Sequence, residues 1–237
     1  MRFPPSLAPC LVLSLAAWLA GCTTAPTAPP PAAPPDAGEW QPFALPGKAP
    51  TRYEWADKDG RRAVMALADH SASMWRKRVV GAGAQQARAV SFSWWVQDAP
   101  ASADLAEADQ ADAPVRVMFG FDGDVASLPL GTRMLFDLAQ ALTGEQPPYA
   151  TLVYVWDPRL PVGTVVKNPR SDRIRNLVVD SGPAPLRRWR DHRRDLAADF
   201  RLAFGEEPGP LTTIALMTDS DNTRSQARAW YGPVELQ

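Results

Sequence analysis

Three oxygen-bearing side chains follow an apolar run in the segment "IALMTDSDNT" near the end of the chain. Asp219 and Asp221 are two residues apart, and Asn222 comes directly after them. An EF-hand loop begins with this spacing, but its later glycine and bidentate acid are replaced here by Arg224 and Trp230. Two interpretations stay open. One is an oxygen cage for Ca²⁺ that uses Asp219 and Asp221, and the other, which we favour, is a polar turn whose side chains bind nearby backbone amides.

A second pair of carboxylates, Asp122 and Asp124, has the same spacing in "FDGD". Residues two apart on an extended chain share one face at about 6–7 Å, and glycosidases use carboxyl groups about 5–9.5 Å apart. Asp122, Asp219 and Asp221 are therefore candidates for a carboxylate-dependent glycoside hydrolase or lyase. If "FDGD" and "DSDNT" met at one end of the fold, four carboxylates would converge and a metal would become the better interpretation.

Tryptophan is the richest source of candidate ligand contacts, with nine in the chain. Trp94 and Trp95 are adjacent, so in a strand they point to opposite faces. Indole rings stack against the C–H faces of sugars, while arginine and aspartate bind the hydroxyl groups. Trp95, Arg116 and Asp122 would form such a glycan-binding face if their strands paired. The alternative, favoured for any single tryptophan, is that the ring fills the core between two sheets.

Nucleophilic catalysis by the usual devices has little support. The chain has two histidines, His70 and His192, and lacks G-x-S-x-G, H-E-x-x-H, C-x-x-C and phosphate-loop motifs. We expect His192 to face solvent on a charged helix. The 25 basic residues are balanced by 26 acidic ones, so net charge gives no reason to expect a nucleic acid partner.

Alternating apolar and polar residues predict that most of the chain forms strands. "TRYEWADKDGRRAVMALAD" predicts a hairpin that turns at Asp59 and Gly60. "ARAVSFSWWVQ", "PVRVMFGFDGD", "YATLVYVWD", "LTTIALMTD" and "ARAWYGPVEL" predict further strands. Helices are predicted for "GTRMLFDLAQALTG", ending at Gly144, and for "PLRRWRDHRRDLAADFRLAFG", ending at Gly205. The expected fold is mainly β: a two-sheet jelly-roll β-sandwich of about eight or nine strands with one or two inserted α-helices.

The N-terminus carries a predicted processing signal. Arg2 precedes an apolar stretch that is too short to span a bilayer, and the stretch ends in "LAGC". All four positions match the bacterial lipobox, in which the cysteine accepts a diacylglyceryl group. Residues 1–22 are therefore interpreted as a lipoprotein signal peptide and Cys22 as the lipidation site. A plain secretory signal is the alternative.

Two further segments follow the predicted lipidation site. Residues 23–38 are rich in proline and alanine and predict an extended tether with a reach of roughly 50 Å. Residues 39–237 are long enough for one domain, and we expect a single β-sandwich. Thr23 follows the cysteine, which by resemblance to enterobacterial sorting favours the outer membrane, with the protein facing the periplasm.

Several motifs carry a resemblance to a known family. "DAPVRVMFGFDGD", "PYATLVYVW", "DLAADFRLAFGEEPGPLTTIALMTDSDNT" and "AWYG" occur in this order. Together they resemble the bacterial domain-of-unknown-function family 3047 over roughly Trp55 to Val234. The resemblance implies no established activity. The strand order is also similar to galactose-binding-like jelly rolls, which bears on the fold and not on function.

These observations lead to three hypotheses. The preferred one is a lipid-anchored envelope protein whose jelly-roll domain binds a ligand, a glycan above all, without catalysis. Its partners would be the membrane, through the anchor, and an envelope glycan. The second is the carboxylate-dependent hydrolase or lyase. The third is an envelope scaffold, which an exposed apolar patch would favour.

Overall fold

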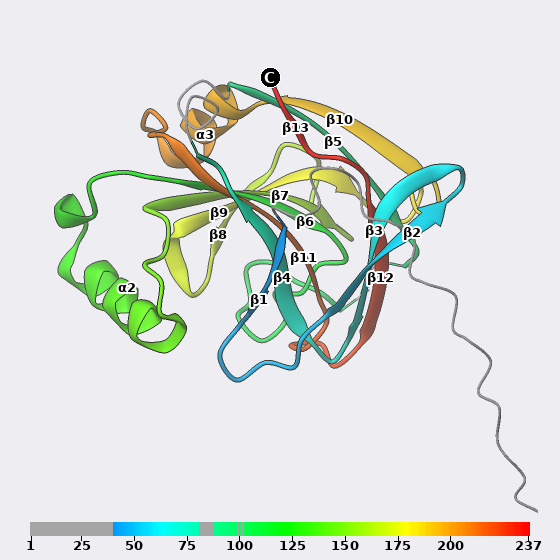
Figure 1. Ribbon diagram of the computed structural model, residues 1–237, viewed down its shortest axis with the longest axis horizontal. Helices are drawn as coiled ribbons and strands as arrows, with labels where there is room; N and C mark the ends of the chain where they lie inside the picture. Colours follow the sequence, from blue (N-terminus) through cyan, green and yellow to red (C-terminus); the bar gives the residue numbers. More distant parts are fainter. Residues whose placement is uncertain (1–39, 81–87, 99, 101) are drawn as a thin grey trace, which may run out of the picture. The chain divides into compact units, whose positions relative to one another are not determined.

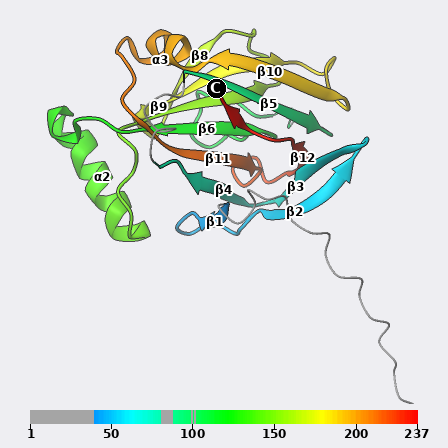
Figure 2. The same ribbon diagram turned by 45° about the horizontal axis from the view of Figure 1, so that its top comes forward.

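The computed structural model describes residues 40–237 except 81–87, 99 and 101. The predicted signal peptide, Cys22 and the tether lie outside the described residues. The described part is a jelly-roll-like sandwich of two β-sheets with two α-helices (Figures 1 and 2), so the predicted fold class is confirmed. None of the helices among these residues has the length and hydropathy needed to cross a membrane.

The two sheets contain more strands than the sequence predicted. The seven-stranded sheet has the order β1 (Gln41–Ala44), β4 (Ala72–Arg78), β11 (Leu211–Asp219), β6 (Arg116–Phe121), β7 (Ala150–Asp157), β9 (Ser171–Ser181) and β8 (Val165–Asn168). The six-stranded sheet has the order β10 (Trp189–Asp195), β5 (Ala89–Val96), β12 (Gln226–Tyr231), β3 (Arg61–Asp69) and β2 (Arg52–Lys58), with β13 (Glu235–Leu236) also pairing with β5. All pairs are antiparallel except β7 with β9. The sequence predicts none of the strands β1, β4, β8, β9 and β10.

Alternation along the strands builds the core, as expected. Val90, Phe92, Trp94 and Val96 of β5 and the corresponding residues of β6, β7 and β11 are buried between the sheets. A smaller apolar cluster, which contains Val153 and Val178, lies on the outer side of the seven-stranded sheet. Trp94 therefore fills the core, and Trp95 lies on the outer face of its sheet.

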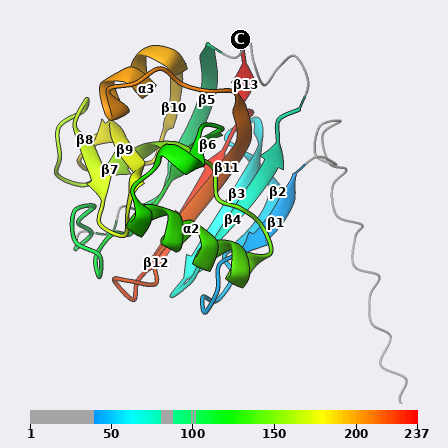
Figure 3. The same ribbon diagram turned by 90° about the vertical axis from the view of Figure 1, so that its left-hand side faces the viewer.

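The predicted hairpin and the first predicted helix are both present. Asp59 and Gly60 have φ values of 49° and 77°, the left-handed conformation that a two-residue hairpin turn requires. Helix α2 (Leu130–Thr143) ends at Gly144, whose φ is 76°. Figures 1 and 2 show α2 standing apart from the strands, and in Figure 3 it lies in front of them.

The second predicted helix is only half correct. Its first part forms strand β10, and α3 (Leu196–Phe204) begins after Asp195, whose side chain accepts a hydrogen bond from the Ala198 N–H. The segment is a strand because Arg190 and His192 point inward and pair with the buried Asp180. The expectation that His192 faces solvent is therefore wrong: its side chain is 9% exposed and stacks on Phe92.

Candidate functional site

The "DSDNT" loop is anchored by a buried ion pair. Asp219 accepts hydrogen bonds from Arg116 Nε at 3.1 Å and Nη2 at 3.2 Å, and from the Ala113 N–H at 2.9 Å. Both side chains of the pair are almost fully buried. Burial raises the pKa of Asp219, and the charge of Arg116 opposes this effect. Met217 of β11 is opposite Arg116 of β6, and Asp219 lies two residues further along β11. The two strands therefore place Asp219 and Arg116 side by side.

Asp112 also holds this loop, although sequence reasoning missed it. Its carboxylate accepts hydrogen bonds from the Asn222 side-chain amide at 2.8 Å, from the Thr223 N–H at 2.7 Å and from the Thr223 hydroxyl at 2.6 Å. The favoured turn is thus present, but its amides donate to the carboxylate of Asp112 from another segment and not to the side chains of the loop itself. Asp112 lies in an irregular segment, where no periodic pattern marks it.

Oxygen atoms of Asp112, Asp219 and Asp221 lie within 4.8 Å of one another. Each of these carboxylates already has donors, however. Those of Asp219 and Asp112 are described above, and Asp221 forms an ion pair with Lys48. A cation at this position would compete with Lys48 and with the Arg116 guanidinium for the same oxygens. The geometry therefore favours a structural ion-pair network over the Ca²⁺ cage.

The other predicted carboxylate lies elsewhere. Asp122 follows the C-terminal end of β6, whereas Asp219 is beside Arg116 at the start of that strand. The exposed Asp122 accepts a hydrogen bond from the next residue, Gly123, at 2.8 Å. "FDGD" and "DSDNT" thus lie at opposite ends of the sheet, and the four carboxylates do not converge. Trp95 belongs to the six-stranded sheet, so its strand does not pair with that of Arg116 and Asp122.

Strand register instead places three tryptophans in a row on the outer face of the six-stranded sheet. Trp189 of β10 is opposite Trp95 of β5, which is opposite Trp230 of β12. The rings of Trp95 and Trp230 meet edge to face, with centroids 5.0 Å apart. The sequence contains all three tryptophans, but only the strand register shows that they lie in a row.

The β2–β3 hairpin covers the middle of the tryptophan row. Lys58 Nζ lies 3.8 Å from the centroid of the Trp95 ring, and the Trp189 Nε1–H donates to the Lys58 carbonyl at 3.1 Å. Trp95 is consequently only 7% exposed, whereas Trp189 and Trp230 are half-buried. The outer two rings are the more exposed ones, although Lys58 Nζ also lies 5.1 Å from the centroid of the Trp230 ring. Trp95 lies between them.

A polar groove of about 670 Å³ lies next to the tryptophan row on the same face. Its lining comes from Ser91 and Ser93 of β5, Asp191 and Arg193 of β10, Pro233 and Glu235 near the C-terminus, and Arg61 and Arg62 of the hairpin. Arg61 connects the groove to the row. It binds both oxygens of Asp191, at 2.5 and 3.2 Å, and lies 5.0 Å from the centroid of the Trp189 ring.

Two polar groups of the groove are available to a ligand. Within the described residues, the exposed side chains of Arg193 and Glu235 make no hydrogen bond or ion pair, whereas Ser93 is only 7% exposed. Glu235 of β13 and Arg193 of β10 flank Ser91, since both are opposite it in the register. Gly232 leaves the room that Ser93 needs, because a Cβ atom there would lie 2.2 Å from the Ser93 Oγ.

The charge state of Asp191 bears on the chemistry of the groove. Hydrogen bonding from Arg61 lowers the pKa of Asp191 below its usual range. A general acid for glycoside hydrolysis needs the opposite shift. The groove therefore offers hydroxyl, guanidinium and carboxylate groups for binding, and one of its two carboxylates is held ionised.

Comparison with protein families identifies one match. The family described as "Protein of unknown function (DUF3047)" matches residues 38–235. The chain belongs to the DUF3047 family. Among the curated proteins, none matches the chain.

Several solved structures resemble this DUF3047 domain at low identity. A family 11 carbohydrate-binding module from Clostridium thermocellum, in complex with a β-1,3-1,4-mixed-linked tetrasaccharide, has 9% identity and a TM-score of 0.42, with 84% of this chain and 88% of that chain covered. The xyloglucanase domain of NopAA, a type three effector from Sinorhizobium fredii, has 6% identity and a TM-score of 0.38, with 84% and 95% covered.

Proposed function

We propose that this DUF3047 domain binds a glycan, without catalysis, in the groove on the outer face of its six-stranded sheet. The observation that carries the proposal is the combination of two partly exposed indole rings with an adjoining groove in which the exposed side chains of Arg193 and Glu235 are unpaired. Trp189 and Trp230 would stack on the C–H faces of sugar rings. Arg193 and Glu235 would exchange hydrogen bonds with sugar hydroxyls.

Hydrolysis by the predicted carboxylates has weaker support. Asp219 is buried and held by Arg116, so a substrate does not reach it, and Asp122 lies at the other end of the sheet. In the groove, the lowered pKa of Asp191 suits a hydrogen-bond acceptor better than a proton donor. These features support binding over bond cleavage.

The proposal includes attachment to the cell envelope. The lipobox "LAGC" would place a diacylglyceryl group on Cys22, and residues 23–38 would hold the domain away from the membrane. We propose an outer-membrane lipoprotein whose domain faces the periplasm and binds an envelope glycan. Radiolabelled palmitate should be incorporated into the wild type and not into Cys22→Ser. No incorporation into the wild type would contradict the anchor, and incorporation that persists in Cys22→Ser would contradict Cys22 as its site. Neither result bears on the glycan proposal.

Affinity electrophoresis tests the glycan proposal. The purified protein is run through gels that contain envelope polysaccharides, and it is sedimented with insoluble peptidoglycan. A glycan that binds should retard the wild type. Trp230→Ala should weaken that binding roughly tenfold or more, the equivalent of about 1.4 kcal/mol.

Two matched controls separate the groove from the rest of the surface. Phe43→Ala removes a half-buried aromatic ring from the other sheet, and Lys167→Ala removes an exposed cation there for comparison with Arg193→Ala. Both controls should bind as the wild type does. Equal losses in Trp230→Ala and Phe43→Ala would count against the groove, and no retardation by any glycan would end the proposal.

A further inference from the structure

Helix α2 presents its apolar face to solvent. Its exposed large apolar residues are Leu130 (65%), Met134 (62%), Leu135 (51%), Leu138 (55%) and Leu142 (61%). The helix buries only Thr132 and Phe136. The exposed side chains present roughly 500 Å² of apolar area, as large as the biggest patch on a typical monomer, and such patches mark interaction sites.

The exposed residues have the arrangement of a helix-packing surface. Leu130, Met134, Leu138 and Leu142 are spaced by four residues, so they form one continuous ridge along the helix. Gly131 and Ala139 lie in the neighbouring row, and a Cβ atom at Gly131 would meet nothing within 4 Å. This row also contains Leu135, so its small residues lie on either side of one large residue, and a second helix can approach closely at those two positions.

We propose that a second copy of this chain covers the face, with α2 packed against α2 of the other copy across a two-fold axis. Two identical i±4 ridges interdigitate in the commonest helix-packing class, and a two-fold contact brings the same patch of both copies together. Complete burial of the five side chains in both copies would cover about 1,000 Å² in total, which is the threshold for a specific interface.

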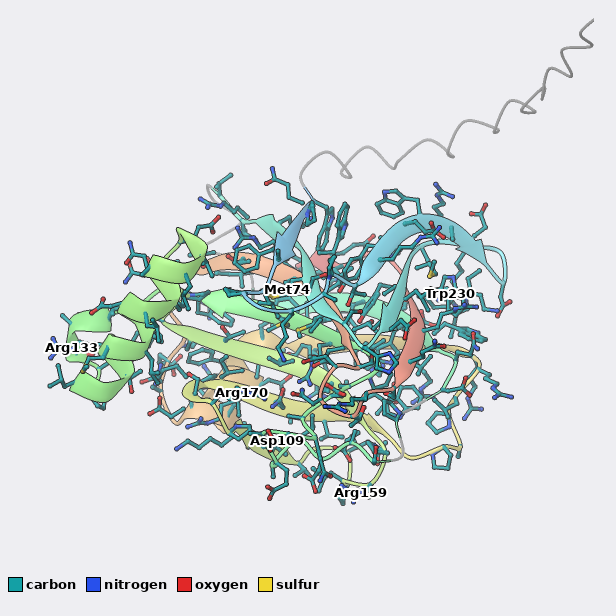
Figure 4. All side chains as sticks on the ribbon, turned by 90° about the horizontal axis from the view of Figure 1, so that it is seen from below. Met74, Asp109, Arg133, Arg159, Arg170 and Trp230 are labelled. Carbon is teal, nitrogen blue, oxygen red and sulfur yellow. The ribbon has the colours of Figure 1, made fainter. Side chains whose placement is uncertain are left out.

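The polar side of α2 favours a second copy of the chain over a lipid surface as the partner of this face. It carries one positive charge, Arg133, and one negative charge, Asp137, beside Gln140. Helices that lie on membranes gain attraction from several Lys and Arg residues on that side. In Figure 4, Arg133 on α2 and Trp230 lie at opposite ends of the view, so pairing through α2 leaves the glycan-binding face open.

Sedimentation equilibrium of the full chain in detergent tests the pairing. The wild type should form dimers, and Leu138→Gln should raise the dimer dissociation constant roughly tenfold or more. Leu202→Gln is the matched control, because Leu202 is a 62% exposed leucine on α3. It should dimerise as the wild type does. Since both leucines are exposed, thermal unfolding should show that both variants remain folded.

Cysteine cross-linking supplies a second readout. Leu138→Cys and Met134→Cys place a thiol on the ridge, and Gln140→Cys places one on the opposite side of the same helix. Oxidation should link the ridge variants more than Gln140→Cys. The proposal would be overturned if the wild type sedimented as a monomer at all concentrations and all three cysteine variants cross-linked equally. Monomers that bind phosphatidylcholine vesicles and lose that binding in Leu138→Gln would also overturn it and would assign the face to lipid.

Discussion

The pairing of Arg116 with Asp219 illustrates how a site predicted from residue types acquires another role through burial. The spacing of Asp219 and Asp221 left a Ca²⁺ cage open beside the favoured turn, but a guanidinium from the neighbouring strand reaches both carboxylate oxygens of Asp219. Two buried charges are tolerated only as a pair. The same atoms that would hold Ca²⁺ thus join β11, β6 and the loop.

Arg116→Leu should lower the free energy of unfolding by about 3–5 kcal/mol, because it leaves the Asp219 charge buried without its partner. Urea denaturation measures the loss. The double variant Arg116→Leu with Asp219→Leu should recover part of it, since no charge then remains unpaired. A loss below about 1 kcal/mol in the single variant would contradict this assignment.

Acid should weaken the protein partly through Asp180. Burial raises the pKa of this carboxyl, but hydrogen bonds from His192, Arg190 and Trp94 outweigh burial and bring it below 3.8. A lowered folded-state pKa contributes stability that is present above 3.8 and is lost as the pH falls through the folded value. The unfolding free energy of the wild type should therefore fall below pH 4.

Asp180→Asn checks this assignment, because it should show a shallower decline between pH 4 and 2 when urea denaturation is repeated at each pH. The control is Asp122→Asn, which removes an exposed carboxyl and should decline as the wild type does. Equal slopes for wild type and Asp180→Asn would show that another group is responsible.

At the scale of elements, the start of α3 is held by one side chain. Asp195 accepts a hydrogen bond from the Ala198 N–H at 2.9 Å, and α3 in turn buries Leu196 and Phe200. Asp195→Ala should cost about 1 kcal/mol in unfolding free energy. Asp137→Ala, an exposed position within α2, should change it by less than about 0.5 kcal/mol. Equal effects would argue against the cap.

Some elements could be predicted from the sequence because their signals are local. Asp59 and Gly60 specify a turn by backbone conformation alone, and the alternation in β5 separates Trp94 from Trp95. The sequence does not predict strand β10, because charged residues occupy both of its faces and no apolar alternation marks it. Its inward charges pair with Asp180 and Asp199, which are contributed by other elements.

The candidate site depended on long-range pairing that no local pattern reveals. The sequence predicts a helix around Trp189 and so does not indicate that this residue lies opposite Trp95. The α2 ridge was predicted to be helical, yet the sequence did not show that its apolar face would remain uncovered. Residue types thus indicated the chemistry, and sheet register decided which side chains meet.

At the scale of the whole domain, the two outer faces differ in character. The six-stranded sheet carries Trp189 and Trp230 beside the groove, whereas the seven-stranded sheet carries the half-buried Met74 and Met217, which are opposite each other on β4 and β11. Figure 4 labels Met74 and Trp230, one residue of each sheet. A ligand can bind to one of these two faces. Tryptophan and methionine side chains are both readily oxidised, so oxidation reports on each face.

Hydroxyl-radical footprinting of the purified protein, with and without the glycan that retards it, tests the central claim most directly. Oxidation of Trp189 and Trp230 should fall when the glycan is bound, while oxidation of Met74 and Met217 should stay the same. Protection of the methionines with unchanged tryptophans would place the ligand on the seven-stranded sheet and contradict the proposed groove.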